Sequence, residues 1–171
     1  MAVSQSDDQR LDREFLDACS KGEYESAMHL LAEEPGAAKR LGAMDERLES
    51  AVHKACASGN MQLVKKLVSQ KAAIDTEDKT GYRPIVIAVQ FGRLDLVEVL
   101  SGSGASLTAV NSKDGRHLLH YAAWAGHTEL LRHLISTNQF DSELIEMPDS
   151  TGRTPLALAA FRCPASRRAS V

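Results

Sequence analysis

Small and apolar residues recur along the chain with a period of about 33 residues. The recurring alanines, separated by 37, 33, 34 and 37 positions, are Ala18, Ala55, Ala88, Ala122 and Ala159. An apolar cluster follows each of the first four alanines at the spacing i, i+1, i+4, i+5, which is the stripe of an amphipathic helix. Each period is therefore predicted to contain two short helices.

A glycine separates the two predicted helices of each unit. It stands four residues after the alanine in each of the first four units, at Gly22, Gly59, Gly92 and Gly126. A left-handed residue commonly ends a helix, and a residue without a Cβ adopts that conformation at little cost. The glycines thus predict a tight turn and an antiparallel helix pair.

The segments between units carry turn residues. Residues 78–84, 113–116 and 149–156 combine Asp and Gly, and the first and third also contain Pro. Asp supplies local hydrogen bonds, Gly a positive φ, and Pro suits the first turn of a helix. These segments are predicted to be short β-hairpin-like turns that open helices.

With this pattern the chain resembles the ankyrin repeat family. The signature D-x-x-G-x-T-P-L-H-x-A-A-x-x-G-H-x-E is approached closely in residues 119–129 and 149–160. Residues 79–112 match it with Arg-Pro-Ile in place of Thr-Pro-Leu, residues 48–78 lack the Thr-Pro opening, and residues 11–36 match weakly, as an N-terminal capping repeat would. The resemblance covers residues 11–161.

The resemblance implies an all-α solenoid of helical hairpins with four to five repeats. The expected repeats are 11–47, 48–78, 79–112, 113–149 and a partial repeat at 150–161, with disordered ends at 1–10 and 162–171. Proteins of this family present a concave surface, formed by the turn tips and the first helix of each pair, to other proteins. Such a stack buries its core between neighbouring repeats and offers a surface rather than a substrate cavity.

The variable positions of the first helices are expected to face that surface. In the last three units most of them are apolar, and we predict a partner-binding strip of Ile87, Gln90, Phe91, Tyr121, Trp124, Leu158 and Phe161, because exposed aromatic residues are frequent binding hot spots. The alternative is that some of these side chains turn inward. The turn-tip residues Asp78, Lys79, Lys113, Asp114 and Arg153 are candidate rim contacts.

Composition and charge narrow the range of possible functions and partners. Apolar residues are 43% of the 171 positions and aromatic residues only 5%, which favours helix packing through Ala, Leu, Val and Ile. Twenty Lys and Arg against 23 Asp and Glu give a net charge of −3, whereas a nucleic-acid-binding domain is usually strongly basic. We therefore expect neither nucleic acid nor membrane as a partner, and the absence of a secretion signal or a long apolar run favours the cytosol or the nucleus.

The sequence contains few candidate residues for catalysis or metal binding. No phosphate-binding loop, serine-hydrolase, zinc-protease or Cys-x-x-Cys motif occurs, so the chain is expected to be no enzyme and to hold no cofactor or metal. His53 and His120 share a position at which the family uses histidine structurally, and Cys19 and Cys56 share a small core position.

The C-terminal segment departs from the repeat pattern. No apolar stripe follows Phe161, so the second helix of the last unit is expected to be missing, which would leave Leu130, Leu131, Leu134 and Ile135 uncovered and open to self-association. Such an ending suggests a truncated form of a longer protein. Ser170 follows Arg167-Arg168-Ala169 and is a candidate phosphorylation site.

These observations favour a non-catalytic adaptor or scaffold that binds another protein. The alternative is the targeting part of a larger protein, such as a ubiquitin-ligase subunit, an enzyme or a channel.

Overall fold

The computed structural model describes residues 5–32 and 36–162, which form helices joined by turns. The helices are α1 (Gln5–Lys21), α2 (Tyr24–Ala32), α3 (Ala37–Leu41), α4 (Ala51–Ser58), α5 (Met61–Ser69), α6 (Pro84–Gln90), α7 (Leu94–Gly102), α8 (Leu118–Ala125), α9 (Thr128–Ser136), α10 (Ser142–Glu146) and α11 (Pro155–Arg162). Within the described ranges there is no β-sheet, only an isolated antiparallel bridge between Met44 and Ser50. The predicted all-α class is confirmed.

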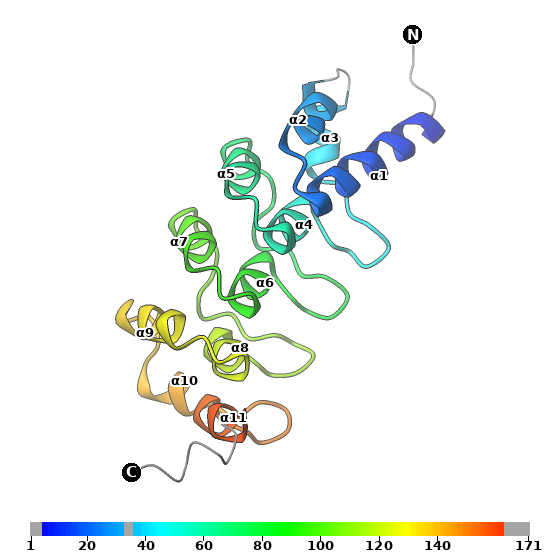
Figure 1. Ribbon diagram of the computed structural model, residues 1–171. Coiled ribbons are helices and arrows are strands. Elements are labelled where there is room, and N and C mark those ends of the chain that lie inside the picture. Colours follow the sequence, from blue (N-terminus) through cyan, green and yellow to red (C-terminus); the bar gives the residue numbers. More distant parts are fainter. Residues whose placement is uncertain (1–4, 33–35, 163–171) are drawn as a thin grey trace. The chain divides into compact units, whose positions relative to one another are not determined.

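The chain divides into two compact units. Unit 1 comprises residues 1–88 and 95–105, and unit 2 comprises residues 89–94 and 106–171. In unit 1, α1 packs against both α2 and α4, and α4 packs against α5; in unit 2, α8 packs against α9 and α11 (Figure 1). Unit 1 therefore contains the predicted pairs α1–α2 and α4–α5, and unit 2 contains the predicted pair α8–α9.

The glycines between paired helices adopt the predicted conformation. The φ angles of Gly22, Gly59, Gly92 and Gly126 are 72°, 79°, 68° and 80°, in the left-handed region that favours glycine. At Gly126 the backbone N–H donates to the carbonyl of Ala122 at 2.9 Å and so closes the end of α8.

The core of each unit consists mostly of aliphatic and small side chains. In unit 1 it includes Cys19 and Cys56, which are fully buried as their shared position predicts, and burial raises the pKa of the Cys19 thiol to about 12. In unit 2 it includes Leu118, Leu130 and Leu134 from α8 and α9.

Three helical features differ from the sequence prediction. Helix α1 begins at Gln5, six residues before the expected start of the array at residue 11. The short helices α3 and α10 were not predicted, because five residues are too few to display a periodic stripe. Asp141 caps α10, since its carboxylate accepts the backbone N–H of Leu144 at 2.8 Å.

Candidate functional site

The predicted binding strip separates into exposed and buried side chains. Phe91, Trp124 and Phe161 are 57%, 39% and 69% exposed, and Gln90 is half-buried. Ile87, Tyr121 and Leu158 are buried, so the expectation that they face solvent is wrong. We call Phe91, Trp124 and Phe161 the aromatic surface.

Packing explains two of the three buried positions. Ile87 belongs to the buried run at residues 84–89 in α6, and a helix that is apolar on all sides is buried on all sides. Leu158 is fully buried in α11, which packs against α8. Both side chains therefore belong to the core.

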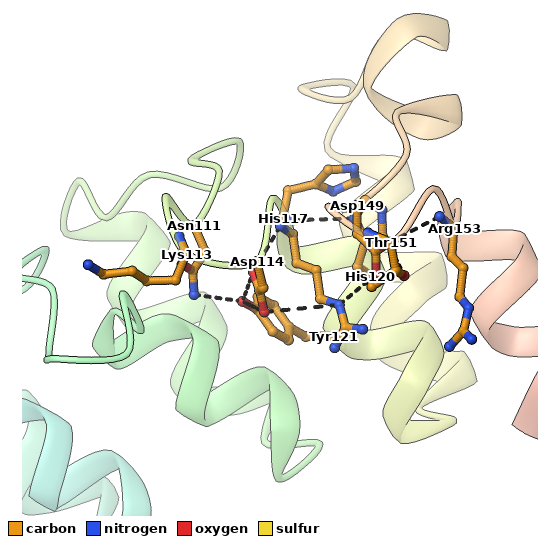
Figure 2. A network of polar contacts seen from close by, with 10 residues as sticks. Asn111, Lys113, Asp114, His117, His120, Tyr121, Asp149, Thr151 and Arg153 are labelled. Carbon is orange, nitrogen blue, oxygen red and sulfur yellow. Dashed lines mark hydrogen bonds and ion pairs between the residues drawn. The ribbon is translucent and has the colours of Figure 1, made fainter.

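Tyr121 is buried because its hydroxyl group has polar partners inside unit 2. The hydroxyl donates to the carboxylate of Asp114, whose two oxygens both lie at 3.0 Å, and accepts from Nδ2 of Asn111 at 2.9 Å (Figure 2). A satisfied hydroxyl lets the ring pack inward without a large desolvation cost. Sequence spacing could not reveal these partners, which lie seven and ten residues away.

A buried carboxylate orders the next turn. Asp149 accepts hydrogen bonds from the backbone and hydroxyl of Thr151 at 2.9 and 2.6 Å, and Nε of Arg116 lies 2.9 Å from its other oxygen (Figure 2). Burial tends to raise the pKa of Asp149, but these hydrogen bonds and the backbone N–H of Arg153 outweigh it and hold the pKa well below its usual value.

The candidate rim residues fall into two groups. Lys79, Lys113 and Arg153 are exposed and can contact a partner. Asp78 and Asp114 are partly buried and hold their own turns: Asp78 accepts the backbone N–H groups of Thr80 and Tyr82, both at 2.8 Å, and Asp114 accepts from Tyr121.

Trp124 and Phe161 are in contact within the aromatic surface. Their rings stack with centroids 6.2 Å apart and an angle of 14° between the planes. The guanidinium group of Arg162 lies 5.9 Å from the centroid of Trp124 and donates to the Trp124 carbonyl at 2.8 Å. Arg153 lies over the Phe161 ring at 5.3 Å.

Phe91 belongs to the same unit and has its own arginine. Arg93 lies over the Phe91 ring at 5.2 Å. Next to Phe91, the carbonyl of Gln90 accepts a hydrogen bond from Nε2 of His127 at 2.9 Å, which ties this turn to the end of α8, where Trp124 lies. Each exposed ring of the aromatic surface therefore has a cation over its face.

The recurring histidine has a structural role in unit 1. Nδ1 of His53 accepts the backbone N–H of Ser50 at 3.1 Å, and Nε2 donates to the carbonyl of Tyr82 at 3.0 Å. The histidine thus joins the start of α4 to the following turn. Burial lowers the pKa of His53 and favours the neutral ring.

In unit 2 the corresponding position is His120, and His117 stands where Ser50 stands in unit 1. The rings of His117 and His120 are 4.2 Å apart, and both side chains are buried. Burial lowers both pKa values, that of His117 to about 4 with a further contribution from His120. Within residues 5–32 and 36–162, no three His, Cys, Asp or Glu side chains are grouped so as to hold a metal ion.

The apolar face expected to drive self-association is largely covered. Leu130 and Leu134 are buried and Leu131 is half-buried, which leaves Ile135 as the exposed member of that set. The expectation that these leucines lie open is wrong, because they pack within unit 2. Ser170 lies outside the described residues. None of the described helices has the length and apolar character needed to cross a bilayer.

One turn of unit 1 is not predicted by the sequence pattern. Residues 45–49 form a turn of the same kind as those at Asp78 and Asp149. The backbone N–H of Asp45 donates to the carbonyl of Glu49, and the Asp45 carboxylate accepts the backbone N–H groups of Arg47 and Glu49 at 2.8 and 2.9 Å. The position that holds Gly81 or Gly152 in those turns is occupied here by Leu48, with φ 59°. The Asp-x-x-Leu pattern was the available signal, and the missing glycine concealed it.

The comparisons with known proteins agree with this architecture. The family "Ankyrin repeats (3 copies)" matches residues 15–111, and the family "Ankyrin repeat" matches residues 114–141.

Several curated relatives contain a similar segment. They include the putative E3 ubiquitin-protein ligase XBAT31 of Arabidopsis thaliana, 26% identical over 94% of this chain and 36% of the relative. Inversin of Danio rerio is 34% identical over 51% of this chain and 8% of the relative, and a transient receptor potential cation channel subfamily A member 1 homolog of Caenorhabditis elegans is 32% identical over 67% and 9%. The chain spans about a third or less of the length of these relatives. The helix pairs, the left-handed glycines and the family matches lead to one conclusion: this chain belongs to the ankyrin repeat family.

Proposed function

We propose that this chain is an adaptor that binds a partner protein through the aromatic surface in unit 2. Ankyrin repeats are non-catalytic interaction modules, and the observation that carries the proposal is the exposure of Phe91, Trp124 and Phe161. They are three of only eight aromatic residues in the chain. Large exposed aromatic side chains are costly in solubility and are typical anchors of protein interfaces.

The stacked arrangement of Trp124 and Phe161 supports a preformed site. The two rings are supplied by α8 and α11, which pack against each other. Rigid elements hold the rings in place, so little side-chain entropy is lost when a partner docks. Lys113 and Arg153, exposed on neighbouring turns of unit 2, supply rim contacts.

Affinity capture with matched variants tests this function. Trp124→Ala and Phe161→Ala should each remove the specifically captured partners, as measured by quantitative mass spectrometry. Leu156→Ala is the control, because Leu156 lies on α11 and is 79% exposed but does not belong to the aromatic surface. An unchanged set of captured proteins with both aromatic variants would contradict the proposal.

A second candidate is the substrate-recruiting part of a larger ubiquitin ligase. It is favoured by the match of 94% of this chain to a segment of a putative E3 ubiquitin-protein ligase. We expect a captured partner to be ubiquitinated when this chain is fused to a ubiquitin-ligase catalytic domain, and not when the fused chain carries Phe161→Ala. The buried free thiol of Cys19 is compatible with the reducing cytosol or nucleus in which such a role would be carried out.

A further inference from the structure

We propose that the aromatic surface recognises an acidic segment of the partner protein, in which carboxylates flank an apolar or aromatic side chain. This inference rests on the proposed function and adds the chemistry of the ligand. It follows from the arginines of the aromatic surface, whose positions relative to the rings are given by the structure and not by the sequence.

Each ring of the aromatic surface is paired with a different arginine. The distances from guanidinium to ring centroid are 5.2 Å for Arg93 and Phe91, 5.3 Å for Arg153 and Phe161, and 5.9 Å for Arg162 and Trp124. A guanidinium over a ring still presents N–H groups at its edge, and these groups suit a carboxylate in bidentate geometry. The surface thus offers apolar contact and anion contact side by side.

Two of these cations have no carboxylate partner within residues 5–32 and 36–162: no Asp or Glu there lies within ion-pairing distance of Arg153 or Arg162. Both side chains are exposed. Some arginines elsewhere in the chain do pair with carboxylates: Arg83 contacts Asp75 and Glu77, and Arg116 contacts Asp149. The aromatic surface therefore presents positive charge that an acidic partner would neutralise.

Unit 2 is also less acidic than unit 1. Among the described residues, unit 2 contains six Lys and Arg against six Asp and Glu, whereas unit 1 contains twelve against fifteen. An open aromatic cage would favour a cationic ligand, but here the chain's own arginines already lie over the rings. A basic ligand would meet like charge, so the arrangement selects against it.

Peptide display provides the direct test. Wild-type protein is used to select from a library of random 12-residue peptides, and each selected peptide is resynthesised and measured by fluorescence anisotropy. We expect enrichment of Asp and Glu around an apolar or aromatic residue, and binding that weakens roughly tenfold when Gln replaces the acidic residues. The same peptides should bind more weakly as salt concentration rises.

Two charge variants then locate the contact. Arg153→Glu and Arg162→Gln should each weaken binding of the acidic peptides by about tenfold or more, while Arg132→Glu on α9 serves as the matched control. Circular dichroism melts of all variants establish that each is folded. Trp124→Ala should abolish binding of the same peptides.

The possible outcomes distinguish a failure of the acidic-ligand proposal from a failure of the proposed function. Selection of basic or uncharged peptides that Trp124→Ala still abolishes would overturn the acidic ligand and leave the proposed function standing. Binding that requires phosphoserine in place of Asp or Glu, or that is reproduced by a second copy of this chain instead of a peptide, would likewise overturn it. Peptides whose affinity is unchanged by Arg153→Glu, Arg162→Gln and Trp124→Ala would overturn both proposals.

Discussion

At the scale of single residues, Leu48 shows how a structural position can be kept when its usual residue is absent. Its φ of 59° lies in the left-handed region, which costs a residue with a Cβ roughly 1 kcal/mol or more. The carboxylate of Asp45 holds the turn in place, since it accepts two backbone N–H groups and pairs with Lys54. The side chain of Leu48 is 44% exposed.

Replacement of Leu48 by glycine should therefore stabilise the chain. Leu48→Gly relieves the left-handed strain but also increases the entropy of the unfolded chain, so we expect a net gain of about 0.5–1 kcal/mol in the free energy of unfolding. Urea denaturation followed by circular dichroism measures it.

The reverse change in an equivalent turn is the control. Gly152 has φ 78° and nothing within 4 Å of the position of an added Cβ. Gly152→Leu should therefore cost about 1 kcal/mol for conformational reasons alone. Equal stability of both variants and the wild type would contradict this account of Leu48.

At the scale of elements, α4 and α8 begin in similar ways but differ in charge chemistry. In both, a histidine at the third helical position accepts the N–H of the residue that precedes the helix: His53 from Ser50 and His120 from His117. In α8 that preceding residue is itself a buried histidine, whose ring lies 5.9 Å from that of Phe140. The start of α8 therefore holds two neutral imidazoles in the core of unit 2.

This arrangement predicts a loss of stability at mildly acidic pH. The folded pKa of His117, about 4, lies below its ordinary value of 6.5, so between these values the unfolded state binds a proton that the folded state does not. The contribution of His117 to stability is complete above pH 6.5 and is lost as the pH falls toward 4. The free energy of unfolding lost between neutral pH and pH 5 is about 2 kcal/mol. The lowered pKa of Asp149 acts in a separate window, below pH 3.8.

Urea unfolding followed by fluorescence of Trp124, the single tryptophan, reports on unit 2. His117→Asn removes the titrating ring, so we expect a smaller fall in stability between pH 7 and pH 5 than in the wild type. His29→Asn, at an exposed position of α2 outside unit 2, is the matched histidine substitution against which the effect of His117→Asn is compared. An identical pH dependence for His117→Asn and the wild type would exclude His117 as the cause.

At the scale of the whole molecule, the side chains that stabilise the fold and those proposed to bind a partner lie on the same helices. On α11, Leu158 is fully buried and Phe161 is 69% exposed. On α8, Tyr121 points into the polar network of Figure 2, while Trp124 belongs to the aromatic surface. We therefore expect that the proposed binding can be separated from stability by mutation.

Leu158→Ala and Phe161→Ala test this separation. Leu158→Ala should cost about 2–5 kcal/mol in the free energy of unfolding, because it removes buried methyl groups and leaves a cavity. Phe161→Ala should cost less than about 1 kcal/mol while it abolishes partner binding. Thermal melts and the peptide anisotropy assay, applied to both variants, measure the two effects.

Much of the fold was predictable from the sequence. The repeat period, the helix pairs and the left-handed glycines follow from local chemistry: a stripe of apolar side chains, and a residue that lacks a Cβ where φ is positive. Pro84 and Pro155 begin α6 and α11, as their preference for the first helical turn predicts. The turn at Asp45 was not found, because its signal depends on a glycine that the chain replaces with Leu48.

The sequence by itself thus determined the repeat architecture and the family, because the apolar stripes, the glycines and their repeat period can be read from the order of residues alone. Only the tertiary structure decided which members of the predicted strip are exposed. Tyr121 is drawn inward by Asn111 and Asp114, Leu158 by the packing of α11 on α8, and Arg162 reaches Trp124 across 38 residues of chain. The exposed area of a side chain is what its neighbours leave uncovered, and those neighbours come together only in the folded chain.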